Sequence, residues 1–300
     1  MEKLVNKVNL FLDSGAFSAM TQGVSIDIQE YIQFIQDNKE CIDVYANLDV
    51  IGNPGATWKN QLIMEKAGLT PLPCFHYGED VKWLKLYISK GYEYIALGGM
   101  VKTPNLISWL DDLWSRYLTD DEGLPIVKIH GFGLTGLTLL LRYPWYSVDS
   151  TSWVVTGRLG SIYVPRLKGG KWCYDEQSWK ISVSNKSPDA KEAGKHIDTF
   201  PKMQKDAIID YIEAKGYKLG KSTFRKEEQT YVLQDNEKWS EKKPTDKKAQ
   251  RLVETIVEVG IANSYQLRDE MNIIYFLDLE KSVPAYPRKF EHKNINQSLF

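Results

Sequence analysis

The chain has 300 residues, of which 43% are hydrophobic and 26% charged, and its 38 basic and 39 acidic side chains leave a net charge of −1. This composition is typical of a globular protein, and the balanced charge means that any contact with nucleic acid requires a local basic patch. Three widely spaced cysteines without a C-x-x-C pair argue against a disulfide framework. No apolar stretch approaches the ~20 residues that span a bilayer, and no secretory signal precedes the first apolar run. We therefore expect a cytoplasmic protein without membrane contact.

Short apolar runs alternate with helical patterns through the first half of the chain. The runs occupy residues 9–13, 44–49, 72–78, 94–99, 127–131 and 146–150, and the helical patterns lie at 26–35, 58–66, 81–88, 104–117 and 134–142. This alternation predicts an α/β fold with right-handed βαβ units and a parallel sheet. Six successive units, with no Gly-x-Gly-x-x-Gly after the first strand, favour a (β/α)8 TIM-type barrel over an open doubly wound sheet. We expect the seventh and eighth strands at 161–165 and 180–184.

The composition changes near residue 187, where Lys and Glu become more frequent and the Gly-rich strand ends disappear. The predicted domains are therefore a catalytic barrel over residues 1–186 and a mainly helical C-terminal extension over 187–300, packed on the barrel. Helical patterns are expected at 203–215 and 247–259. The charged stretch 234–248 is expected to be a solvated loop, and its lysines are candidates for phosphate contacts.

Polar or small residues follow the apolar runs, at the carboxyl ends where α/β folds place their chemistry. The acids are Asp13, Asp49 and Asp149, and the other positions are His76, Gly98, Gly99 and His130. Taken singly, an Asp after a strand often caps a helix, a His often packs in the core, and a Gly pair often makes a turn. Three acids and a Gly pair on one rim together favour a catalytic site.

Four segments resemble, in the same order, the signature motifs of the tRNA-guanine transglycosylase superfamily. Residues 12–17 (Leu-Asp-Ser-Gly-Ala-Phe) resemble its Asp-Ser-Gly-Gly-aromatic signature, and residues 96–100 (Ala-Leu-Gly-Gly-Met) resemble its base-binding turn. Residues 128–133 resemble its His-x-x-Gly-x-Gly strand end, and residues 147–150 resemble the strand that carries its nucleophile. The resemblance covers roughly residues 8–153, about half of the chain.

In this family, a carboxylate attacks the anomeric carbon of a nucleotide and expels guanine, and a 7-deazaguanine then resolves the covalent glycosyl intermediate. The resemblance assigns the nucleophile to Asp149 and the general acid and base to Asp13. It places Asp49 at the amidine edge of the base and the backbone of Gly98 and Gly99 at its carbonyl. Further substrate-binding positions implied by the motifs are Ser14, His76, Met100 and His130, with His76 standing where the family has an amide side chain.

Two departures from the tRNA enzymes point to DNA as the substrate. Their Cys-x-Cys-x-x-Cys and His zinc site is absent, since only Cys173 lies in that region, and we expect no metal and no cofactor. The preamble that precedes their first motif is also missing. Both features resemble the phage-type 7-deazaguanine DNA transglycosylases, which implies two partners: DNA with a flipped or single-stranded guanine, and a free 7-deazaguanine such as 7-cyano-7-deazaguanine. The alternatives are a tRNA-guanine transglycosylase, a base-removing N-glycosidase and an inactive nucleic-acid-binding barrel, and the oligomeric state is left open.

A basic, Gly-rich segment follows the predicted nucleophile strand. Its cations Arg158, Arg166, Lys168 and Lys171 are set among glycines and aromatic side chains. Such a composition suits contacts to a phosphate backbone and stacking on bases, and equally an ordinary solvated loop. We interpret these four residues as the candidate nucleic-acid-binding set.

Overall fold

The computed structural model describes residues 10–101, 103–134, 136–186, 192–243, 245–246 and 249–291. The chain divides into two compact units: unit 1 comprises residues 1–150 and 284–300, and unit 2 comprises residues 151–283. The division follows residue 150, whereas the sequence placed it after residue 186. Among the described residues, no helix is long and apolar enough to cross a membrane.

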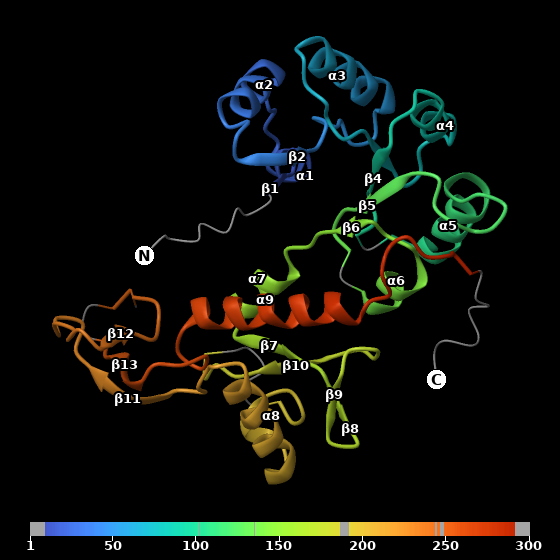
Figure 1. Cartoon of the computed structure of the whole chain (residues 1–300). Coiled ribbons are helices and arrows are strands. Elements are labelled where there is room, and N and C mark those ends of the chain that lie inside the picture. Colours follow the sequence, from blue (N-terminus) through green and yellow to red (C-terminus); the bar gives the residue numbers. More distant parts are fainter. Residues whose placement is uncertain are drawn as a thin grey trace, which may run out of the picture. The chain divides into compact units, whose positions relative to one another are not determined.

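Unit 1 is an α/β unit, which confirms the predicted class. Its described elements in chain order are β1 (Leu10–Leu12), α1 (Ala16–Gln22), α2 (Ile28–Asp37), β2 (Ile42–Tyr45), α3 (Pro54–Lys66), β3 (Cys74–His76), α4 (Lys82–Ser89), β4 (Tyr94–Gly98), α5 (Leu106–Leu113), the π-helical turn η1 (Trp114–Leu118), β5 (Lys128–Gly131), α6 (Leu137–Arg142) and β6 (Ser147–Val148). Figure 1 shows α2, α3, α4 and α5 along the outer side of the row of strands.

The strands of unit 1 follow one another in chain order and are parallel. One sheet pairs β1 with β2, another has the order β3-β4-β5-β6, and an isolated parallel bridge between Ala46 and Leu72 lies between them. Because parallel strands share their direction, their carboxyl ends lie along one edge. Within the described residues the row does not close into a barrel.

The core of unit 1 is aromatic and packs the strands against their helices. Trp114, Tyr87, Phe75 and Tyr143 are almost completely buried there. The hydroxyl of Tyr143 donates to the buried carboxylate of Asp111, over 2.8 Å, so the polar end of this ring is also satisfied. This packing holds the strand ends in place for the polar side chains that follow them.

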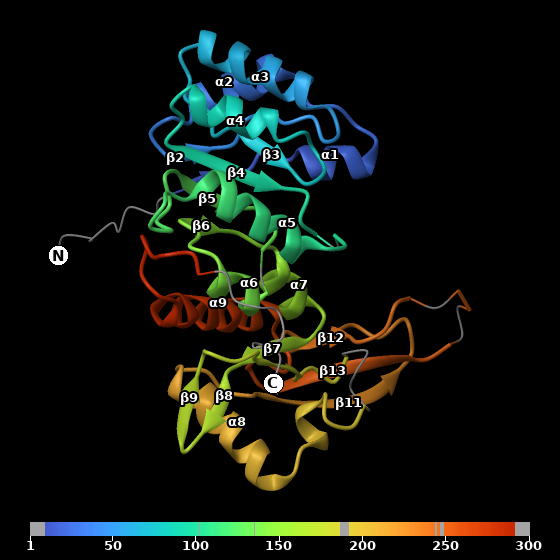
Figure 2. The same cartoon turned by 90° about the vertical axis from the view of Figure 1, so that its right-hand side faces the viewer.

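Unit 2 combines three helices with antiparallel hairpins. Its described elements are α7 (Ser152–Arg158), β7 (Ser161–Val164), β8 (Arg166–Lys168), β9 (Lys171–Cys173), β10 (Trp179–Ser182), the 3₁₀ turn η2 (Ile197–Thr199), α8 (Lys202–Ala214), β11 (Lys221–Glu227), β12 (Glu237–Trp239), β13 (Arg251–Glu258) and α9 (Tyr265–Ser282). In Figures 1 and 2, the β8–β9 hairpin and the sheet β11-β13-β12 extend from opposite ends of this unit.

The predicted seventh and eighth barrel strands exist, but their pairing is different. β7 pairs antiparallel with β10, and both belong to unit 2. Their apolar side chains Ile162, Val164 and Ile181 are buried in one cluster with Ile208 of α8 and Met271 of α9. An apolar run indicates that a strand is buried but not whether it runs parallel or antiparallel to its partner. The sequence alone predicts that these two strands continue the parallel order of the first six.

The region after residue 187 is not mainly helical. The predicted helix at 203–215 is confirmed by α8, but residues 251–258 of the predicted helix at 247–259 form β13. This strand is paired on both sides, by β11 and β12, and it is rich in β-branched residues, which favours a strand. The charged stretch 234–248 contains β12, and its residues 244, 247 and 248 lie outside the described part of the chain.

Candidate functional site

The three acids predicted from the sequence lie at the carboxyl ends of strands in unit 1. Asp13 directly follows β1, Asp49 follows β2, and Asp149 directly follows β6. Burial raises the pKa of Asp13, and the negative charge of Asp49 raises it further. Burial likewise raises the pKa of Asp149, with a smaller upward contribution from the charge of Asp13. Asp13 is therefore close enough to both Asp49 and Asp149 for their charges to interact.

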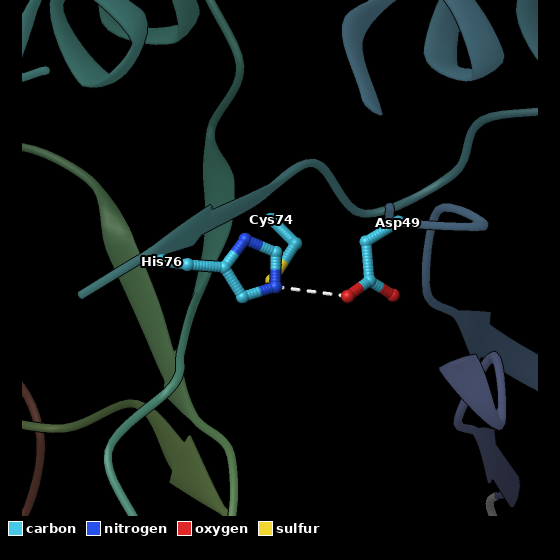
Figure 3. Close-up of side chains that lie close together, drawn as sticks. All are labelled: Asp49, Cys74 and His76. Atoms are coloured by element: carbon cyan, nitrogen blue, oxygen red, sulfur yellow. Dashed lines mark hydrogen bonds and ion pairs between the residues drawn. The ribbon is translucent and has the colours of Figure 1, made fainter. Parts of the chain in front are cut away.

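A chain of polar contacts holds Asp49. The hydroxyl of Ser14 donates to Asp49 Oδ1 over 2.8 Å, and His76 Nε2 lies 2.8 Å from Asp49 Oδ2. On the other side of the ring, His76 Nδ1 lies 3.1 Å from Glu79 Oε1, and the backbone N–H of His76 donates to Glu79 Oε2 over 3.0 Å. Figure 3 shows the ring of His76 directed edge-on toward Asp49. Both oxygens of Asp49 are therefore positioned.

The imidazole of His76 is protonated between the two carboxylates. Burial alone lowers the pKa of His76, but its contacts with Cys74, Asp49 and Glu79 outweigh burial and raise the pKa to about 12. Burial also raises the pKa of Cys74 to about 11. Near pH 7 the thiol is therefore neutral, and the hydrogen bonds of the ring with Asp49 and Glu79, rather than the charge of a Cys74 thiolate, favour the protonated imidazole. The arrangement is an ion triad, carboxylate–imidazolium–carboxylate, and it is buried.

Glycine at position 98 makes room for this histidine. His76, the last residue of β3, is in register with Gly98 of β4. A Cβ atom at position 98 would lie 2.7 Å from Cδ2 and 3.1 Å from Nε2 of His76. The adjacent Gly99 has a φ of 71°, in the left-handed region that glycine adopts readily. Each glycine of the pair thus has a local structural reason. Gly98 allows the close approach of the His76 ring, and Gly99 makes the turn that follows β4.

The same cluster offers three ligand atoms to a metal ion. One donor atom each of Asp49, Cys74 and His76 lie within 4.8 Å of one another. The Cys74 Sγ and His76 Nε2 atoms are 3.4 Å apart, close to the about 3.5 Å expected between sulfur and nitrogen ligands of tetrahedral zinc. Glu79 at the other ring nitrogen resembles the carboxylates that orient metal-binding histidines. Because Nε2 already bonds Asp49, a metal would have to replace that bond.

Asp149 lies beside a neutral histidine. The backbone N–H of Gly133 donates to Asp149 Oδ1 over 2.7 Å, and His130 Nε2 lies 3.8 Å from the same oxygen. Burial lowers the pKa of His130 to about 4, so its ring is uncharged at neutral pH. The ring stacks on Phe11 with centroids 4.3 Å apart, and His130 Nδ1 is 2.6 Å from Ser147 Oγ. His130 Nε2 is buried without a hydrogen-bond partner among the described residues.

The other predicted positions fall in different environments. Gly98 is buried and Gly99 exposed, while Met100 is only 4% exposed and packs in the core of unit 1. The four predicted nucleic-acid-binding cations all lie in unit 2: Arg158 ends α7, Arg166 and Lys168 are on β8, and Lys171 is on β9.

Two of these cations have partners within unit 2. The Arg166 guanidinium donates to the carbonyl of Gln177 over 2.8 Å and lies over the ring of Trp179. Lys168 pairs with Glu176. Lys171 is exposed, and Arg158 lines a separate cavity of unit 2. Arg166, Lys168 and Lys171 thus share the β8–β9 hairpin, whereas Arg158 belongs to α7.

Sequence reasoning missed three members of the unit 1 site: Cys74, Glu79 and Tyr31. The hydroxyl of Tyr31 donates to the carbonyl of Ala46 over 2.9 Å, and burial, then the charges of Asp13 and Asp49, raise its pKa. For Glu79 a signal existed, since an acid three residues after a histidine can contact it across a turn.

No family model, curated protein or solved structure matches the chain.

Proposed function

We propose that the protein is a guanine transglycosylase that exchanges guanine in DNA for a 7-deazaguanine, such as 7-cyano-7-deazaguanine, through a covalent glycosyl-aspartate intermediate. The observation that supports this most is the shared environment of Asp13 and Asp149, each with a raised pKa, at the carboxyl ends of β1 and β6. Displacing a base from a sugar requires one carboxylate to capture an oxocarbenium-like carbon and a second carboxyl group to protonate the leaving base.

Asp149 is the proposed nucleophile. Its ionised carboxylate forms a bond to the anomeric carbon as the bond from that carbon to guanine breaks, and the bonding electrons leave with the base. The backbone N–H of Gly133 holds one carboxylate oxygen. The second oxygen remains to attack. The neutral ring of His130 adds no positive charge that would reduce the nucleophilicity of Asp149.

Asp13 is the proposed general acid and base. Its raised pKa favours the protonated form that donates a proton to the departing guanine. In the second half-reaction the resulting carboxylate accepts a proton from the incoming 7-deazaguanine, whose nitrogen displaces Asp149 from the sugar. Two displacements retain the configuration at the anomeric carbon, as base exchange requires.

Asp49 is the proposed reader of the amidine edge of the base. Ser14 and His76 each hold one of its oxygens, so its orientation is fixed before the base arrives. Preorganised hydrogen-bonding groups of this kind select a base without losing free energy to reorganisation. Gly98 and Gly99 lie next to this triad in β4 and in the turn after it.

The order of the strands supports the barrel relationship as part of the proposal. Six parallel strands in consecutive order are the arrangement of the first six units of a (β/α)8 barrel. In such barrels, catalytic groups come from the ends of several strands, and the proposed set follows that rule.

A base-exchange assay tests the proposal. The full chain is incubated with guanine-containing DNA and, separately, with tRNA, each with 7-cyano-7-deazaguanine or radiolabelled guanine. The polymer is digested and its nucleosides are identified by mass spectrometry. We expect incorporation into DNA without net loss of base, and none with the Asp149→Asn variant.

The other outcomes separate the alternatives. Incorporation into tRNA alone identifies a tRNA enzyme, and abasic sites without incorporation identify an N-glycosidase. Binding of nucleic acid with neither product rejects the enzymatic proposal.

A further inference from the structure

Unit 2 contains a cavity with an excess of positive charge in its lining. The cavity has a volume of about 600 Å³, within the range of small-molecule sites. Its cationic side chains are Arg158, Lys186, Lys238 and Arg268, and Glu254 is the one carboxylate among its described lining residues. The ligand chemistry follows from how these charges are paired.

Two lysines share the single carboxylate. Glu254 Oε2 lies 2.9 Å from Lys186 Nζ and 3.6 Å from Lys238 Nζ, and Ser222 donates to Glu254 Oε1 over 2.8 Å. Burial raises the pKa of Glu254, but these contacts outweigh burial and the pKa is lowered. The carboxylate is therefore ionised, and it neutralises one of the two lysines.

Neither arginine forms an ion pair among the described residues, but the charge of Asp269, which is outside the cavity lining, attracts both. Arg268, only 6% exposed, donates through Nε and Nη1 to the carbonyls of Gly157 and Ile261, each over 2.6 Å. The Arg158 guanidinium lies 6.0 Å from the ring centroid of Tyr265. Carbonyls and a ring orient these cations. Even with Asp269 counted beside Glu254, four cations face two carboxylates, so the site keeps a positive excess.

We propose that this cavity binds the phosphate group of a nucleotide, either free or within a nucleic-acid strand. Phosphate oxygens accept hydrogen bonds from arginine and lysine more strongly than neutral acceptors do. Ser184 and Asn263 add polar groups to the lining, and the exposed ring of Tyr265 offers a stacking surface for a base. The inference rests on this cavity alone and is independent of the activity proposed for unit 1.

Calorimetric titration of the full chain with three probes tests the site: inorganic pyrophosphate, dGMP and a single-stranded oligodeoxynucleotide. The test variant is Arg158→Ala/Lys186→Ala, because both residues are exposed and Lys238 still faces the buried carboxylate of Glu254 once Lys186 is removed. The matched control is Lys180→Ala/Lys226→Ala, which removes two exposed cations of the same unit outside the cavity lining. We expect about tenfold or more weaker binding in the test variant, because charge-assisted hydrogen bonds are lost, and less than about twofold change in the control.

The three probes identify the source of the phosphate. Binding of pyrophosphate and dGMP that is lost in the test variant supports a free nucleotide. Binding of the oligonucleotide alone, with a smaller salt dependence in the test variant, supports phosphates of a strand. The proposal is overturned if no probe binds the wild-type chain, or if test and control variants weaken binding equally.

Discussion

His76 Nε2 lies 2.8 Å from Asp49 Oδ2, and the pair is buried at the carboxyl ends of the strands in unit 1. The contact joins a base-reading acid of the proposed site to a histidine whose other ring nitrogen faces Glu79. Removing the imidazole would leave two carboxylates near one another without the cation between them. The contact therefore links the stability of unit 1 to the geometry of the proposed site.

The first prediction is a pH-dependent contribution of His76 to stability. The hydrogen bonds with Asp49 and Glu79 raise the pKa of His76 in the folded chain above the ordinary value of about 6.5. Between the ordinary and the raised pKa the folded chain holds more protons at this ring than the unfolded chain, so this stabilisation is full below about pH 6.5 and declines as pH rises, by at most about 1.4 kcal/mol per pH unit.

Denaturant unfolding of the wild type and of His76→Gln from pH 6 to 9 measures this effect. The wild type is expected to lose its advantage over the variant steadily as pH rises. A stability difference that stays constant over this range would show that His76 is neutral in the fold.

The second prediction is that Asp149→Ala abolishes covalent capture and base exchange. The variant lacks the carboxylate that bonds to the anomeric carbon, while the Asp149 side chain is 41% exposed and contributes little packing. We expect an unchanged unfolding midpoint and no covalent protein–DNA adduct on a denaturing gel, whereas the wild type gives one. Exchange at the wild-type rate in this variant would assign the nucleophile to another residue.

The third prediction concerns the proton transferred by Asp13. Asp13→Asn keeps the shape of the side chain but cannot exchange the proton, and general acid–base catalysis contributes about 10²–10⁴-fold, so we expect a rate loss of that size. Since burial and Asp49 raise the pKa of Asp13, the wild-type rate is expected to fall as pH rises through that raised pKa and Asp13 loses its proton. This decline should be absent from the variant, and a loss below tenfold would limit Asp13 to a structural role.

Much of unit 1 is predictable from sequence because its strands are apolar runs that end in polar residues. The six runs and the acids after three of them can be read directly, as at Asp13, Asp49 and Asp149. The partners of Asp49 are harder to predict, because Ser14 and His76 are each about 30 positions away in sequence. Only the pairing of the strands brings these residues together.

Unit 2 is less predictable because its pairing is antiparallel and non-local. The run at 161–164 has the composition of any buried strand, and nothing in it indicates that its partner is β10. The segment of β13 carries apolar and charged residues at spacings compatible with a helix or a strand, and pairing with β11 and β12 decides between them. The cavity cations come from separate elements, so sequence spacing could not bring them together.

The fourth prediction is that the purified chain carries far less than one zinc ion per molecule. Asp49, Cys74 and His76 bring donor atoms together, but His76 Nε2 already bonds Asp49 and the Cys74 thiol has a pKa raised to about 11 by burial, which opposes the thiolate form that zinc binds. Elemental analysis of protein purified without chelators measures the content. Stoichiometric zinc that is lost in Cys74→Ser would establish a metal centre here instead of an ion triad.

The last prediction is that Gly98→Ala disrupts the triad from the neighbouring strand. The new Cβ would lie 2.7 Å from His76 Cδ2 and 3.2 Å from Cys74 Sγ, and the ring cannot retreat without lengthening its contacts with Asp49 and Glu79. Overpacking of this kind costs about 1–3 kcal/mol, and we expect base exchange to fall with it because Asp49 loses a fixed partner. Gly55→Ala is the matched control, since its Cβ would approach only Asn53 Oδ1, at 3.7 Å, within the first turn of α3. If denaturant unfolding shows the same stability for both variants, the ring of His76 is free to move and does not fix Asp49.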